Sequence, residues 1–134
     1  MALNTLKPNG LYILLFIRHD SPETTNFHWA FYLHKGAQGG TKYHITNISQ
    51  GQGWVPAHGD TRAVMKEFFL VGLSRIADVP TGRYGFLDRI MTYFDDKLNT
   101  PEMTYRAWIL VILTMLQHPV DGQRVLECDD LLAL

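Results

Sequence analysis

The sequence contains little cysteine, little net charge and no long hydrophobic run. A single cysteine in 134 residues cannot form a disulfide within the chain, which fits a reducing compartment. The formal net charge is −1 and there is no basic stripe, which argues against a nucleic-acid partner. The longest apolar run, Ala107 to Leu113, is far shorter than the ~20 residues of a membrane span, so we interpret it as a buried helix.

The N-terminal segment also lacks a secretion signal. MALNTLKPNG has no charged start followed by a long apolar core and a small-residue cleavage site, so we expect a cytoplasmic protein. Apolar residues make up 46% of the chain and charged residues 19%, which is typical of a globular protein. We therefore predict one domain over residues 1–134, large enough to bury a core without disulfides.

Alternating residues predict a hairpin in which each strand carries a histidine. From Phe27 to His34 the odd-numbered residues are all large and apolar, and His28 lies on the other face. Glycines between Lys35 and Gly40 turn the chain back into a second strand, Thr41 to Ile48, which carries His44. A slip of one residue would move His44 to the opposite face, so the pattern leaves open whether the two histidines share a face.

The remaining periodicities predict an α+β fold, an antiparallel sheet of about five strands packed against two main helices. Besides the hairpin, the predicted strands are Leu11 to Ile17, Trp54 to His58, which Gly59-Asp60 breaks, and one within Val64 to Ile76, where we prefer a strand to a helix. The predicted helices run from Tyr84 to Phe94 and from Thr100-Pro101-Glu102 to Gln117. We expect a hydrophobic pocket between the sheet and this last helix.

The order of these segments resembles a known group of enzymes. A histidine strand (FHWAFYL), a glycine turn, a second strand with a polar residue (TKYHITN) and a later helix (YRAWILVILTML) are similar to the circularly permuted papain-like group. That group includes the lecithin:retinol acyltransferase-like and PPPDE-type thiol enzymes of the NlpC/P60 superfamily, and the chain looks closest to small fungal proteins of this pattern. The resemblance implies that His28 is a base and that His44 orients it.

The resemblance also implies a nucleophilic cysteine in the later helix, and this thiol is missing. Its position falls on Tyr105 or Thr104, whose hydroxyl groups are much poorer nucleophiles at neutral pH. Cys128 lies among acidic residues, whose charge disfavours a thiolate, and it is not in the helix. We therefore interpret the chain as a papain-like protein without thiol chemistry.

The candidate catalytic residues are His28, His44 and Tyr105. A histidine and a phenol can exchange protons with a small molecule, which suits a cyclase or isomerase acting on a hydrophobic small-molecule partner without a cofactor. The candidate substrate-binding residues are Tyr32, Tyr43, Thr104 and Trp108. Two alternatives stay open, a non-catalytic binding or scaffold domain of the same fold, and a hydrolase or acyltransferase with an unrecognised nucleophile. For His28 or Tyr105 taken alone, a purely structural role is the more common one.

No metal site is predicted. His34 shares a face with His28 but lies about 20 Å along the strand, beyond shared coordination. His19, Asp20 and Glu23 have no recognisable ligand spacing, and we interpret their segment as a surface loop.

Overall fold

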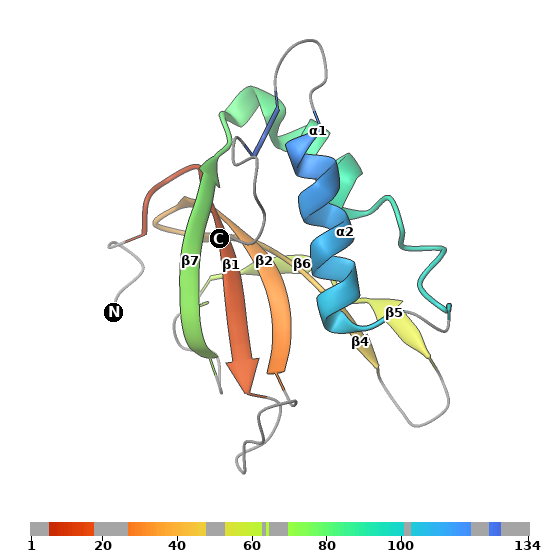
Figure 1. Cartoon of the computed structure of the whole chain (residues 1–134). Coiled ribbons are helices and arrows are strands. Elements are labelled where there is room, and N and C mark those ends of the chain that lie inside the picture. Colours follow the sequence, from red (N-terminus) through yellow and green to blue (C-terminus); the bar gives the residue numbers. More distant parts are fainter. Residues whose placement is uncertain are drawn as a thin grey trace.

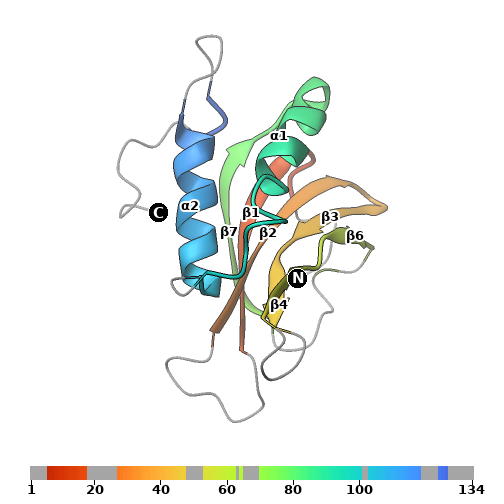
Figure 2. The ribbon, with the colours of Figure 1, turned by 90° about the vertical axis from the view of Figure 1, so that its right-hand side faces the viewer.

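The computed structural model describes residues 6–17, 27–47, 53–62, 64, 70–100, 103–118 and 124–126. Within these ranges it is an α+β fold with a five-stranded antiparallel sheet, in the order β6-β3-β2-β1-β7, and a separate two-stranded sheet, β4-β5 (Figures 1 and 2). The strands are β1 (Gly10–Ile17), β2 (Phe27–Gly36), β3 (Gly39–Tyr43), β4 (Ile45–Asn47), β5 (Trp54–Pro56), β6 (Gly59–Thr61) and β7 (Leu70–Asp78). The helices are η3 (Thr81–Arg83), α1 (Tyr84–Met91) and α2 (Tyr105–Gln117).

Strand β1 is an interior strand of the sheet, next to the edge strand β7, and it is covered on both faces, as its apolar sequence predicts. It pairs antiparallel with β2 on one side and with β7 on the other. Leu11 belongs to the apolar cluster under the helices, whereas Leu14 belongs to a second cluster on the opposite face. The strand predicted within Val64 to Ile76 is confirmed from Leu70 onward, and residues 65–69 lie outside the described ranges.

The predicted second strand of the hairpin is divided at His44. β3 ends at Tyr43, and the residues after His44 form β4, which pairs with β5 instead of β2. The single strand predicted from Thr41 to Ile48 is therefore wrong, because the chain leaves the sheet at His44. The prediction that Gly59-Asp60 breaks the preceding strand is also incomplete, since these residues begin β6, which pairs with β3 at the sheet edge.

Helices α1 and α2 cover the same face of the sheet (Figure 2). Trp108 of α2 is fully buried. Its ring and the Phe31 ring of β2 form a T-shaped pair with 5.5 Å between the ring centres. The predicted start of α2 at Thr100 is wrong, because the helix begins at Tyr105 and the Thr104 side chain accepts the N–H of Ala107 at 3.0 Å. Pro101 and Glu102 lie outside the described residues. The predicted end at Gln117 is confirmed.

No helix in the described segments is both long enough and apolar enough to cross a bilayer. The most apolar of them, α2, has 13 residues, whereas a span needs ~20. The short apolar run in this part of the sequence is therefore a core helix, as predicted.

Candidate functional site

His28 and His44 meet where β3 separates from β2. The last residue pair between these strands joins Phe31 to Tyr43, so His28 lies beyond this pair on β2. His44 follows Tyr43 directly and is the residue at which the segment leaves β2. The Nδ1 atom of His44 lies 3.1 Å from the Nε2 atom of His28, and the ring centres are 5.0 Å apart. The structure therefore places the two half-buried rings together, which the alternation pattern left open.

Tyr105 completes this cluster from the first turn of α2. Its ring centre lies 4.2 Å from that of His28, with 35° between the planes. The ring of Trp54, on β5, meets the Tyr105 ring edge-on at 4.7 Å. The three residues predicted to be catalytic thus converge from β2, from the segment between β3 and β4, and from α2.

The environment of His44 keeps its ring neutral. Burial lowers the pKa of His44 from 6.5 to about 3, and electrostatic interactions with Lys42, His28 and His58 act in the same direction. A backbone hydrogen bond with Ala57 opposes this shift but does not outweigh it. At neutral pH, the ring of His44 therefore offers His28 one N–H donor and one lone pair, without a charge of its own.

His58 was not predicted as a site residue, yet it positions His44. Its Nδ1 atom accepts the backbone N–H of His44 at 3.0 Å, so its proton is on Nε2, which donates to Asp95 at 2.9 Å. Its ring also stacks on Trp108, with centres 6.0 Å apart and 25° between the planes. The sequence carries no signal for this role, because neither the spacing of 14 residues between the histidines nor that of 37 to Asp95 matches a known motif.

We expect His58→Phe to loosen the backbone at His44. Phenylalanine keeps an aromatic ring against Trp108 but leaves the partly buried N–H of His44 without an acceptor, which costs roughly 1–3 kcal/mol of unfolding free energy. Urea unfolding measures this cost, and amide hydrogen exchange at His44 should become faster than in the wild type. Asp95→Asn is the matched control, since an amide oxygen can still accept from Nε2. Unchanged exchange at His44 in His58→Phe would contradict the positioning role.

The predicted substrate-binding residues divide into two groups. Tyr43 and Trp108 are buried beside His58, and the hydroxyl of Tyr43 donates to Asp88 at 2.9 Å. Burial raises the pKa of the Tyr43 hydroxyl, and this hydrogen bond to Asp88 adds to the shift. The Nε1 of Trp108 is buried without a hydrogen-bond partner in the described part of the chain.

Tyr32 and Thr104 have other roles in the structure. Tyr32 lies in the second apolar cluster, and its hydroxyl is 2.8 Å from Nδ1 of His34. Thr104 is exposed and caps α2. Tyr43 and Trp108 therefore lie beside the histidine cluster, whereas Tyr32 and Thr104 make other contacts, and substrate binding by all four residues stays a prediction.

The layer between the sheet and the middle of α2 is filled with side chains. Phe31, Leu33 and Ile112 are each at most 1% exposed there. The middle of this helix therefore packs on core, and the half-buried histidines lie at the N-terminal end of α2.

The described part of the chain contains no candidate metal site. No group of three or more His, Cys, Asp or Glu side chains in the described ranges is arranged to hold a metal ion. His19, Asp20, Glu23 and Cys128 lie outside the described residues. Comparisons of the chain with protein-family models, with curated proteins and with solved structures find no match in any of the three.

Proposed function

We propose that this protein is a small-molecule enzyme of the cyclase or isomerase type, which moves protons with His28, His44 and Tyr105. The observation that carries the proposal is the contact of three proton-exchanging side chains from separate segments, with 3.1 Å between the two histidine nitrogens and 4.2 Å between the His28 and Tyr105 rings. Side chains able to donate and accept protons within one cluster suit general acid–base catalysis.

In this proposal His28 is the base and His44 supports it. When His28 takes a proton from the substrate at Nδ1, its Nε2–H donates to the lone pair on Nδ1 of His44. The pKa of His44, lowered to about 3, prevents the proton from passing on to His44, so the positive charge stays on His28. A neutral acceptor at this distance stabilises the imidazolium and fixes its orientation.

Tyr105 supplies the acid. A phenol beside the imidazolium can donate a hydrogen bond to an oxyanion as it develops on the substrate, or return a proton to it. Trp54 and Tyr105 offer aromatic surface next to the histidines, which favours a hydrophobic substrate. No thiol is required, which agrees with a tyrosine at the position where the permuted papain-like resemblance expects the nucleophile. We also propose that the protein descends from the circularly permuted papain-like fold.

We expect Tyr105→Phe to lower turnover about 10²-fold, the lower end of the effect of a positioned acid or base. Phenylalanine retains the ring that packs against His28 and Trp54, so the fold and ligand affinity should change little. The purified protein is incubated with a metabolite extract, and mass spectrometry detects a compound that is consumed while a product of the same mass, or lighter by one water, appears. The variant is then compared with the wild type on that compound.

A non-catalytic binding domain is the second candidate, and one observation favours it. Tyr105 is only 9% exposed and packs between two rings, as a residue with a purely structural role would. This candidate predicts that the wild type consumes no compound in the extract, or that Tyr105→Phe converts its substrate at the wild-type rate. Either result would contradict acid catalysis by Tyr105.

A further inference from the structure

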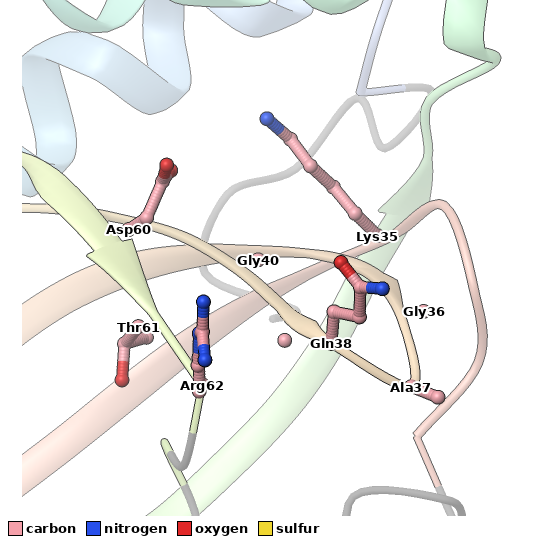
Figure 3. A pocket seen from close by; sticks show the side chains of 9 residues that line it. Lys35, Gly36, Ala37, Gln38, Gly40, Asp60, Thr61 and Arg62 are labelled. Carbon is pink, nitrogen blue, oxygen red and sulfur yellow. The ribbon is translucent and has the colours of Figure 1, made fainter.

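A hollow lies at the far end of the β2–β3 hairpin, away from the histidine cluster. It has a volume of about 520 Å³ and is lined by the hairpin turn and by β6. Figure 3 shows the side chains of Lys35, Gln38, Asp60 and Arg62 pointing to the same side of the β3 ribbon, whereas Thr61 points away from them. Four polar side chains from two separate segments thus surround one space.

Positive charge dominates this hollow. Lys35 and Arg62 contribute two cations, and neither forms an ion pair within the described ranges of the chain. The ammonium group of Lys35 lies 5.3 Å from the ring centre of Tyr84, a contact that orients it without neutralising it. Two cations beside one carboxylate leave the hollow with a net positive charge that attracts an anion, and a guanidinium with an ammonium matches the oxygens of a phosphate group.

Asp60 is the acidic residue of the lining, and it remains able to accept a hydrogen bond. Its Oδ1 accepts the hydroxyl of Thr41 at 2.8 Å, which fixes the carboxylate. The other oxygen makes no hydrogen bond to the described residues. A carboxylate beside an anion site would repel a bare anion but can accept from a hydroxyl group on the same ligand.

Two glycines let the strands that line this hollow pack closely against neighbouring backbone. A Cβ on Gly39 would lie 2.0 Å from the carbonyl oxygen of Thr61, and one on Gly40 would lie 1.9 Å from that of Leu33. Gly39 also has φ +101°, a conformation that favours glycine. A Cβ on Gly36, by contrast, would meet nothing within 4 Å, so a ligand has room beside the turn.

We propose that this hollow binds a small phosphorylated compound that also carries hydroxyl groups, such as a sugar phosphate. Lys35 and Arg62 hold the phosphate oxygens, the Gln38 amide donates to the ligand, and Asp60 accepts from a hydroxyl. The volume of about 520 Å³ lies within the range of small-molecule pockets and exceeds what a lone phosphate needs. Because both cations are exposed, binding should weaken as salt increases.

The test is a titration of the full ¹⁵N-labelled chain with ribose 5-phosphate, inorganic phosphate and ribose as probes. We expect amide shifts centred on Gly36, Gly39 and Gly40, with ribose 5-phosphate binding more tightly than inorganic phosphate and ribose alone not binding at millimolar concentration. Lys35→Gln and Arg62→Gln should each raise the Kd for ribose 5-phosphate about tenfold. Asp60→Ala should strengthen the binding of inorganic phosphate, because a negative charge is removed. It should also narrow the difference in affinity between inorganic phosphate and ribose 5-phosphate, because the acceptor for the ligand hydroxyl is removed.

Arg106→Gln is the matched control, because it removes the same charge from an exposed position on α2. Its Kd should stay within about twofold of the wild type, if binding depends on local contacts and not on net charge. An equal loss in Arg106→Gln, shifts outside the hairpin turn, or no binding of ribose 5-phosphate at about 10 mM would overturn the proposal. Equal affinity for ribose 5-phosphate and inorganic phosphate would overturn the role of Asp60.

Discussion

His28→Ala should lower turnover about 10⁴-fold, the upper end of the effect of one positioned acid or base. The proposed mechanism gives this ring the proton transfer itself, and no other side chain in the cluster can replace it, because the pKa of His44 is lowered to about 3. Because the substitution removes the base of the proton-transfer step and no contact that holds the bound substrate, kcat should fall while KM stays nearly constant. The measurement is a steady-state rate on the compound found by the extract incubation.

The control for this experiment is His118→Ala. His118 is exposed at the C-terminal cap of α2, so the substitution is chemically the same but lies at the opposite end of the helix from Tyr105. Circular dichroism and thermal unfolding check that both variants remain folded, and His28→Asn serves if the alanine variant does not fold. Wild-type turnover in a folded His28 variant would rule out His28 as the base.

Acidification should destabilise the protein at a pH well above that at which most carboxylates titrate. The pKa of His44 is 6.5 in the unfolded chain but about 3 in the folded protein, so between these values only the unfolded state binds the proton. Stability from this group is therefore complete above pH 6.5 and is lost progressively as the pH falls toward 3. The full shift corresponds to roughly 5 kcal/mol of unfolding free energy. Burial lowers the pKa of His34 as well, which adds to the loss in the same direction.

Urea unfolding at pH 7, 6, 5 and 4 measures this loss. Between pH 6 and 4 the unfolding free energy should fall by about 1.4 kcal/mol per pH unit for each histidine that stays neutral in the folded state. His44→Asn should reduce the slope by the contribution of one proton. Lys42→Gln should bring the pKa of the folded-state His44 back toward 6.5 and so reduce the total loss of unfolding free energy, because Lys42 is the second largest cause of the shift. NMR signals of the His44 ring that titrate near pH 6.5 in the folded protein would contradict the expected slope.

Local periodicity was sufficient for the elements that bury a repeating face. β1 and β2 follow the alternation of their side chains, and the body of α2 follows its apolar stripe. Periodicity did not predict where α2 begins, because the N-cap of a helix is the residue whose side chain accepts a free backbone N–H of the first turn, here Thr104. Thr100 and Thr104 have the same side chain, and only Thr104 accepts the N–H of Ala107.

The sequence by itself determined the α+β architecture and the hairpin whose segments carry His28 and His44. It could do so because burial of one face imposes a period of two on strands and about 3.6 on helices. Only the tertiary structure decided that β3 leaves β2 at His44, that His58 holds the His44 backbone and that the hairpin turn forms a hollow with β6. These features join residues far apart in the chain, and their contacts depend on how strands diverge and which edges meet, which no local period records.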